Sequence, residues 1–546
     1  MIADINITEK SFGPKTLMSS VKFSVDNGEK IGIVGRNGVG KSTLFGILTG
    51  TDKDYSGEVI YKNGTVVVAT QQEHHDVGES TVLQYVLAGL PEYSKLSSII
   101  ETYPETMGDD MKMIDEYTQA LMRFDDKGFY QIEEQIEREL DNFQLNGVAH
   151  RKFSTLSGGQ KRLVEIVKIM HSDADLALID EPTNHMDYIA KGQFINWMQS
   201  AREGMLVITH DRDVLREVDR IVELKDGGSA SYKGNYDAYL KQNAVQTGTQ
   251  MNDFEMIEKR IVNLKAKVLD YQRLKEKSRN PGTIQKFKRL EEVSRKELAE
   301  LQAKEKPTFW IDKESAENLN YKVASQYNKF KSRNIRMNLR SDESRSKHVL
   351  IDVKNLSLGY GDNILFEGLN IDLREGEAVE LRGRNGAGKT TLIKTLLGNG
   401  DALQLAGDII LDKHMRVGIY EQEVAPTYFD MPLEQAIESM YMNRKLPITT
   451  TKVRQLLSDY LFTEGDGKVP VARLSGGQKA RFQLIAMLAN DPQLLILDEP
   501  TNHLDLPSIE ELEVALDKYS GAVLYVSHDS YFREALGGEV IQVGAA

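Results

Sequence analysis

A duplicated glycine-rich string constrains the fold of this chain more than any other feature. GRNGVGKS at 35–42 recurs as GRNGAGKT at 383–390, an offset of 348. LSGGQK begins at residue 156 and again at 474, an offset of 318, and later shared strings keep that second offset. Self-similarity over most of the chain predicts two copies of one domain, because 546 residues exceed what one hydrophobic core usually supports.

The two offsets differ because the first copy contains extra residues. Gln72 recurs as Gln422 at an offset of 350, so the change to 318 places 32 surplus residues between Gln72 and Leu156. The stretch at about 95–147 has helical patterning. Residues 101–146 include 13 acidic and 4 basic side chains. We therefore expect an acidic helical arm, whose charge does not suit contact with RNA.

Between the copies, residues 245–346 are charged and helix-favouring. Apolar side chains recur at spacings of three and four on both sides of a Pro-Gly break at 278–283. This pattern predicts an antiparallel helical hairpin, a short coiled coil. Its tip, 271–290, contains seven basic residues and one Glu. The seven are Arg273, Lys275, Lys277, Arg279, Lys286, Lys288 and Arg289.

Composition excludes several classes of protein. There is no cysteine, which excludes disulfides and thiolate metal sites and fits a reducing compartment such as the cytoplasm. We find no apolar run of about 18 residues and no signal-peptide pattern, so no membrane span is predicted. The net charge of −14 argues against a general nucleic-acid binder, although the hairpin tip is locally basic.

Each copy contains a phosphate-binding loop in its usual context. EKIGIVGRNGVGKST reads as an apolar strand, a glycine-rich loop and a helix start. Backbone N–H groups at the helix N-terminus would hold the phosphates. Lys41 would neutralise the phosphate oxygens, and Ser42 would bind Mg²⁺. Lys389 and Thr390 repeat these two residues in the second copy.

An Asp-Glu pair follows an apolar run in each copy, within LALIDEPTNHMD and LLILDEPTNHLD. Asp180 and Asp498 would hold Mg²⁺ through water, while Glu181 and Glu499 would activate the attacking water. A lone Asp-Glu pair ordinarily only ends a strand, but its repeated spacing to the phosphate loop favours the catalytic interpretation. One residue does not fit: Glu380 stands in the strand before the second loop, where an apolar side chain is expected.

These motifs resemble the ATP-binding cassette (ABC) family. LSGGQ resembles its signature loop, which closes over the nucleotide bound by the opposite cassette. The resemblance implies an α/β fold with two ABC-type P-loop nucleotide-binding domains joined by an α-helical hairpin linker. It also implies two competent sites. His210 and His528 would be catalytic switch histidines, Gln72 and Gln422 would sense Mg²⁺ and the γ-phosphate, and Phe12 and Tyr360 would stack on adenine.

By the same resemblance, each ATP site combines a phosphate loop with the signature loop of the other copy. The first site would comprise Gly35, Asn37, Gly38, Gly40, Lys41, Ser42 and Thr43 with Ser475, Gly476, Gly477 and Gln478. The second would comprise Gly383, Asn385, Gly386, Gly388, Lys389, Thr390 and Thr391 with Ser157, Gly158, Gly159 and Gln160.

The chain as a whole resembles the ABC-F family of translation factors, which have twin cassettes, EPTNH motifs and a charged linker. The resemblance implies a first cassette at 1–244 with an arm at about 95–147, a linker at 245–346 similar to the tRNA-interaction motif, and a second cassette at 347–546. It implies a monomeric cytoplasmic ATPase that uses ATP and Mg²⁺. Its partners would be the ribosome, with its rRNA and proteins, and peptidyl-tRNA near the exit site, and it would leave on hydrolysis.

Several functions stay open at this point. Some members of this family sustain ordinary translation and others protect the ribosome from antibiotics; the short tip and the arm favour the first group. An importer's energy-supplying subunit would need a membrane permease and has no use for a basic hairpin. A DNA-repair or chromosome ATPase usually has zinc modules or very long coiled coils, and the sequence predicts neither.

Overall fold

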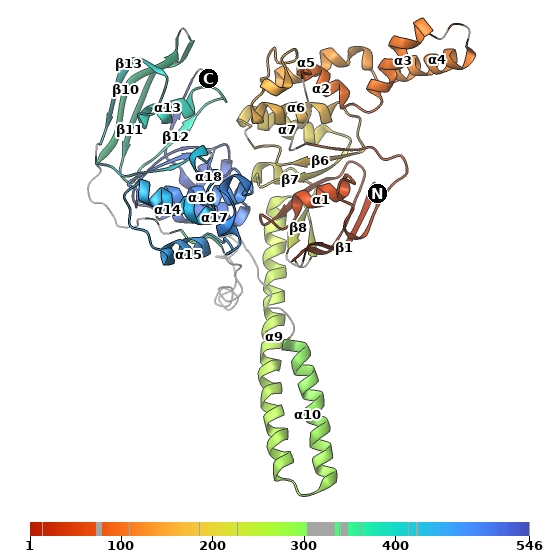
Figure 1. The fold of residues 1–546 in the computed structure, drawn as a ribbon, viewed down its shortest axis with the longest axis vertical. Coiled ribbons are helices and arrows are strands. Elements are labelled where there is room, and N and C mark those ends of the chain that lie inside the picture. The colour runs from red at the N-terminus through yellow and green to blue at the C-terminus, as the bar shows by residue number, and fades with distance from the viewer. Residues whose placement is uncertain are drawn as a thin grey trace. The chain divides into compact units, whose positions relative to one another are not determined.

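The structure, a computed structural model, describes residues 1–13, 15–71, 79–106, 108, 110–184, 186–225, 228–302, 334–337, 339, 348–361, 363–412, 414–421 and 424–544. The chain divides into two compact units, one of 1–236 with 335–546 and one of 237–334. The first unit holds both sequence copies. The predicted α/β class with two P-loop domains and a helical hairpin is confirmed (Figure 1).

The first copy is built on a six-stranded sheet of order β5-β6-β7-β3-β8-β9, in which only β9 runs antiparallel to its neighbour. Strands β6 and β7 are buried along their whole length, as their continuous apolar sequences require. A three-stranded antiparallel sheet, β2-β1-β4, completes the strand framework. The strands are β1 Ala3–Phe12, β2 Lys15–Val25, β3 Lys30–Gly35, β4 Ser56–Tyr61, β5 Val67–Ala69, β6 Leu176–Asp180, β7 Gly204–Ile208, β8 Arg220–Lys225 and β9 Gly228–Lys233.

Helices of the first copy begin where loops end in capping residues. Ser157 caps α6 through a capping box with Gln160, and Asp187 caps α7. Helices α3 and α4 lie side by side (Figure 1), and together with α5 they occupy the stretch in which the acidic arm was expected. The helices are α1 Lys41–Leu48, α2 Val82–Ala88, α3 Tyr93–Thr106, α4 Met111–Asp126, α5 Ile132–Asn142, α6 Gly158–Met170, α7 Tyr188–Ser200 and α8 Arg212–Leu215.

The second copy repeats this plan. Its parallel sheet has the order β14-β15-β16-β12-β17, and its antiparallel sheet has the order β11-β10-β13. The strands are β10 Val349–Tyr360, β11 Asn363–Arg374, β12 Ala378–Arg382, β13 Leu403–Leu411, β14 Val417–Tyr420, β15 Leu494–Asp498, β16 Ala522–Val526 and β17 Glu539–Gln542. The helices are α13 Lys389–Leu396, α14 Leu433–Asn443, α15 Thr450–Asp459, α16 Gly476–Leu488, α17 Leu506–Asp517 and α18 Ser530–Leu536.

The second unit is an antiparallel pair of helices, α9 Tyr236–Lys277 and α10 Pro281–Gln302, which lie side by side in Figure 1. Helix α9 begins before residue 245, and the break falls at the predicted Pro-Gly pair. The rings of Tyr271 and Phe287 stack at 6.3 Å between centroids, and Arg260 forms an ion pair with Glu297 at 2.7 Å. Apolar and charged cross-helix contacts therefore hold the hairpin together. Helices of the described residues are all too short or too polar to cross a bilayer.

Glu380, unexplained by sequence, is a buried carboxylate that accepts hydrogen bonds from Arg382 and forms a longer ion pair with Arg533. Its carboxylate lies 2.7 Å from the Arg382 guanidinium in a bidentate pair and 3.7 Å from Arg533. In the first copy Gly32 corresponds to Glu380 and Leu215 corresponds to Arg533. A Cβ on Gly32 would lie 2.7 Å from the Leu215 side chain. The same position in the two sheets therefore packs differently: a glycine contacts a leucine in the first copy, and a carboxylate pairs with an arginine in the second.

We expect Glu380→Gln to destabilise the second cassette by about 3 kcal/mol, because it removes one partner of a buried ion pair. The thermal unfolding midpoint should fall by several degrees. Glu380→Gly combined with Arg533→Leu, which installs the pair of the first copy, should recover most of this loss. An unchanged midpoint in the Glu380→Gln protein would show that the ion pair contributes nothing.

Candidate functional site

The first phosphate loop directs its lysine and serine toward one point. Gly40 precedes α1 with a φ of 105°, a left-handed conformation that glycine adopts without strain. Lys41 is buried, and its ammonium donates to the carbonyl of Gly35 at 2.6 Å. The hydroxyl of Ser42 donates to Asp180, the last residue of β6, at 3.1 Å. A cation and a hydroxyl–carboxylate pair therefore meet at the end of the central strands.

The second phosphate loop has the same geometry. Gly388 precedes α13 with a φ of 98°, and the Lys389 ammonium donates to the carbonyl of Gly383 at 2.7 Å. The hydroxyl of Thr390 donates to Asp498 at 2.9 Å. These contacts reproduce the first site with threonine in place of serine.

Both glutamates after the strands have strained backbones. Glu181 has a φ of 47° and Glu499 a φ of 51°, values that non-glycine residues rarely adopt. The turn directs each side chain toward the histidine of its own cassette: Glu499 Oε1 lies 3.2 Å from His528 Nε2, and Glu181 Oε1 lies 3.7 Å from His210 Nε2. The same unusual conformation at both positions fits a functional constraint.

Burial shapes the electrostatics of these groups. Burial, together with the Asp180 carboxylate, raises the pKa of Glu181 to about 8, and burial raises the pKa of Glu499 to about 7. Burial also lowers the pKa of His528 to about 3, and burial beside Lys41 lowers the pKa of His210. Both imidazoles are therefore neutral at pH 7. A glutamate with a pKa near neutrality is suited to general-base chemistry.

One aspartate of each cassette bonds the phosphate loop of the other cassette. Asp505 accepts a hydrogen bond from the backbone N–H of Asn37 at 3.0 Å, and Asp187 accepts one from Asn385 at 3.1 Å. Each aspartate also caps the helix that follows it. Both were missed by the sequence analysis, although the repeated string DEPTNH-x-D ends in this residue in both copies. Reciprocal contacts of this kind tie each loop to a rigid helix start of the other cassette.

The signature loops face the phosphate loops of the opposite copy. A cavity of about 590 Å³ is lined by the first signature loop and the second phosphate loop, a volume typical of small-molecule sites. Its lining includes Ser157, Gly158, Gly159, Gln160, Asn385, Gly386, Gly388, Lys389, Thr390, Thr391, Asp498, Glu499 and His528. At the other site the contact is tight, since a Cβ on Gly477 would lie 2.2 Å from Asn37 Nδ2. Ser475 caps α16 as Ser157 caps α6, so a helix N-terminus faces each loop.

The remaining predicted residues have varied placements. Phe12 and Tyr360 are exposed, each at the end of a strand, and neither lines the cavity described above. Gln72 and Gln422 lie outside the described residues. Among the described residues, no group of three His, Asp or Glu side chains could hold a metal ion by itself. A hydroxyl beside one aspartate suits Mg²⁺, which usually keeps several waters and binds phosphate oxygens.

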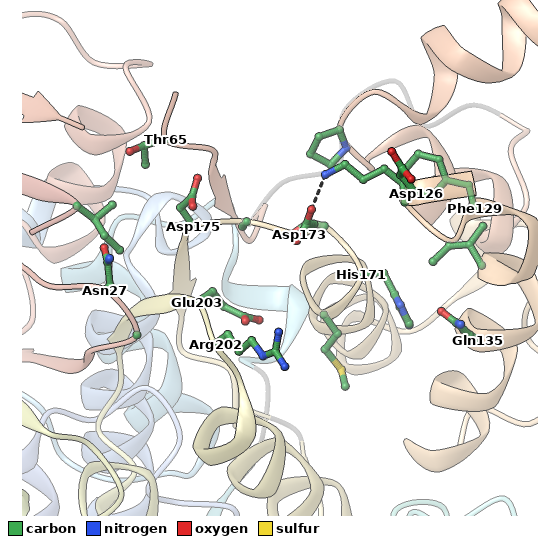
Figure 2. Close-up of a pocket in the computed structure, with 18 of the residues that line it drawn as sticks. Asn27, Thr65, Asp126, Phe129, Gln135, His171, Asp173, Asp175, Arg202 and Glu203 are labelled. Carbon is green, nitrogen blue, oxygen red and sulfur yellow. Dashed lines mark hydrogen bonds and ion pairs between the residues drawn. The ribbon is translucent and has the colours of Figure 1, made fainter. Parts of the chain in front are cut away.

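A separate cavity of about 630 Å³ lies in the first cassette (Figure 2). Its lining includes His171, Asp173 and Asp175 before β6, and Arg202 and Glu203 before β7. The phosphate loop follows the carboxyl end of β3, which runs parallel to β7. This cavity therefore lies at the amino ends of the strands, on the opposite side from the phosphate loop. It contains no glycine-rich loop, so it is not the nucleotide site.

Two phosphate loops, each completed by the other copy, define a twin-cassette nucleotide-binding protein. A family model described as ABC transporter matches residues 18–184 and 366–502, and a second model with the same description matches 222–309. ABC transporter F family member 5 of Arabidopsis thaliana is 30% identical over 550 residues, which cover 98% of this chain and 74% of that protein. Ribosome protection protein VmlR of Bacillus subtilis is 29% identical over 535 residues, which cover 97% of this chain and 85% of that protein.

A solved structure has the same fold. The archaeal ribosome recycling factor aABCE1, crystallised with the archaeal ribosomal stalk protein aP1, aligns with a TM-score of 0.60 at 17% identity, over 99% of this chain and 90% of that one. The sequence matches cover both cassettes and most of the hairpin. The chain therefore belongs to the ABC family of ATPases and, within it, to the ABC-F branch.

We expect Glu499→Gln to stabilise the nucleotide-free protein at pH 8. Between an unfolded pKa near 4.5 and a folded pKa of about 7, the folded chain holds a proton that the unfolded chain releases. The stability contributed by Glu499 therefore falls as pH rises through this window, and it stays low above it. Glutamine has no charge to bury, so the gain in unfolding midpoint should be greatest at pH 8 and vanish near pH 4.5. The exposed Glu464→Gln is the control, and an equal gain in both proteins would contradict the assignment.

Proposed function

We propose that this protein is an ABC-F ATPase of the cytoplasm that binds the ribosome in its ATP-closed state, near the exit site and peptidyl-tRNA, and leaves after hydrolysis. The observation that carries the proposal is a helical hairpin with a basic tip on an otherwise acidic chain. Six of the seven basic residues at the tip are exposed. The seventh, Lys275, forms a 2.8 Å ion pair with Glu291. A positive tip on a negative body favours local contact with an RNA backbone over general RNA binding.

The hydrolytic cycle follows from the paired sites. Lys41 and Lys389 would neutralise the phosphates of two ATP molecules, and Mg²⁺, held by Ser42 or Thr390 with the strand-end aspartate, would supply charge neutralisation at the phosphates. Each γ-phosphate would also meet the opposite signature helix, so ATP favours the closed form. Glu181 and Glu499 would take a proton from the attacking water. Hydrolysis removes the contact that favours closure, and the cassettes separate.

Support for the ribosome as the partner also comes from the relatives. VmlR, which this chain resembles along 97% of its length, is named a ribosome protection protein. The acidic arm, α3 to α5, suits a basic ribosomal protein rather than RNA. A transporter subunit or a DNA-repair ATPase would give no role to the basic tip, and stimulation of ATP hydrolysis by ribosomes but not by DNA would separate these classes.

We expect the variant with both Glu181→Gln and Glu499→Gln to sediment with ribosomes in ATP, because it closes but does not hydrolyse. The same variant should inhibit translation in a cell-free system. Adding Lys41→Ala and Lys389→Ala should abolish sedimentation, since closure then fails. If the double glutamine variant stays free of ribosomes in ATP, the proposal is wrong.

Neutralising the exposed tip should weaken ribosome binding without changing ribosome-free ATP hydrolysis. The variant replaces Arg273, Lys277, Arg279, Lys286, Lys288 and Arg289 by Gln. Each lost phosphate contact lowers the slope of log affinity against log salt by about 0.7–0.9. Lys265→Gln with Lys267→Gln on the same hairpin is the matched control. Equal affinity and salt dependence in both variants would exclude the tip from the ribosome contact.

Protection of the ribosome against antibiotics is the second candidate function, favoured by the similarity to VmlR. Growth with and without the gene across ribosome-targeting antibiotics distinguishes the two. If the protein is a translation factor, cells without the gene should grow poorly even without drug. If it is a protection protein, those cells should be sensitive only to one or a few drug classes.

A further inference from the structure

A buried lysine of the first cassette contacts the histidine loop of the second. Lys191 on α7 is 6% exposed, and its ammonium lies 2.7 Å from Asp213 and 3.1 Å from Asp211 of its own cassette. The same ammonium donates to the backbone carbonyl of His528 at 2.6 Å. Three acceptors thus match the three donors of an ammonium group.

The surrounding residues reinforce this contact with further bonds between the cassettes. Arg212 donates to Glu513 at 2.5 Å and to Asp529 at 3.0 Å. The hydroxyl of Ser530 donates to Asp213. The loop after His528 is therefore held by side chains of the first cassette.

The lysine contact is one-sided, although Glu513 and Ser530 of the second cassette bond Arg212 and Asp213 of the first. The position that corresponds to Lys191 in the second cassette, 318 residues later, is Ile509, and the position that corresponds to Arg212 is Ser530. Isoleucine has no donor to offer to the loop of His210. The histidine loop of the second ATP site is therefore contacted by a lysine of the first cassette. The second cassette has no lysine at the equivalent position to contact the loop of His210.

The supported loop holds His528 against Glu499, which follows β15 in the second site. The His528 backbone N–H donates to Glu499 Oε2 at 3.2 Å, and His528 Nε2 lies 3.2 Å from Glu499 Oε1. The bond from Lys191 to the His528 carbonyl limits rotation of this loop. It therefore limits the directions in which the backbone nitrogen and Nε2 of His528 point. The glutamate–histidine pairs of both sites line one cavity of about 40 Å³, so movement in this loop is close to both reactions.

Lys191 is also fully charged. Burial alone would lower the pKa of Lys191, but Asp211 and Asp213 outweigh burial and raise it. Loss of the ammonium would leave two carboxylates and one carbonyl without their shared donor, a large local change at a site next to His528.

We propose that Lys191 is a positioning residue for the second ATP site: it belongs to the first cassette but orients the His528 loop, so that hydrolysis by Glu499, and not by Glu181, depends on it. The proposal rests on the catalytic roles proposed for these glutamates. It is independent of the ribosome.

The test measures single-turnover release of labelled phosphate from γ-labelled ATP, with the full-length chain in excess and no ribosomes present. Glu181→Gln leaves only the second site active, and Glu499→Gln leaves only the first. Lys191→Met, which keeps the apolar stem, should slow the second site about tenfold, the loss of a buried charged hydrogen bond, and change the first site less than twofold. ATP affinity should be unchanged at both sites, because Lys191 does not touch a phosphate loop. Lys191→Arg should restore most of the rate.

The control is Lys225→Met, which removes another lysine of the first cassette, one whose ammonium bonds Tyr232 and Glu223 rather than a histidine loop. It should not discriminate between the sites. Equal slowing of both sites by Lys191→Met, no slowing of either, or a second site that releases no phosphate even with Lys191 intact would each overturn the proposal. Phosphate release by the variant lacking both glutamates would instead refute the catalytic roles and leave ribosome binding untouched.

Discussion

The structure depends on two hydrogen bonds that run in opposite directions between the cassettes. Asp187 and Asp505 each cap a helix in one cassette and accept the backbone N–H of Asn385 or Asn37 in the other. One carboxylate thus satisfies its own helix and an orphan donor of the facing loop, at a point where the phosphates would bind. Because each bond needs the other cassette, neither nucleotide site is complete on one copy alone. This reciprocity supports the proposal that ATP stabilises the closed form rather than either copy by itself.

Short-range sequence patterns predicted much of the site. The phosphate loops, strand-end aspartates and following glutamates lie within a few residues of a strand and a helix start, so local sequence determines their placement. The hairpin was predictable for the same reason, from apolar spacing around the Pro-Gly break. By contrast, Asp187, Asp505 and Lys191 act on residues hundreds of positions away, and no local pattern indicates such a contact. The left-handed backbone of Glu181 and Glu499 was also beyond prediction, because only the surrounding fold imposes it.

The two cassettes share their chemistry but differ in the polar contacts beneath it. Glu165 of the first cassette is fully buried, is bonded to Lys168 at 2.8 Å, and accepts the backbone N–H of Gln71 at 3.0 Å. The matching residue in the second is Gln483, whose buried Oε1 has no hydrogen-bond partner among the described residues. Together with Glu380 and Lys191, this contrast indicates that two copies with equal motifs need not work at equal rates. If one site hydrolyses ATP faster than the other, the two cassettes would lose their ATP-dependent contacts in a fixed order.

The most direct test of the account is the number of Mg-ATP molecules retained per chain by the variant with Glu181→Gln and Glu499→Gln after rapid removal of free nucleotide. Composite sites predict two retained molecules, falling to one when Ser475→Arg blocks the first site, and likewise to one when Ser157→Arg blocks the second. In the Ser475→Arg protein the remaining molecule should depend on Lys389 and not on Lys41. Two molecules retained despite either serine substitution would show that each cassette holds its nucleotide alone, and the shared-site account would be wrong.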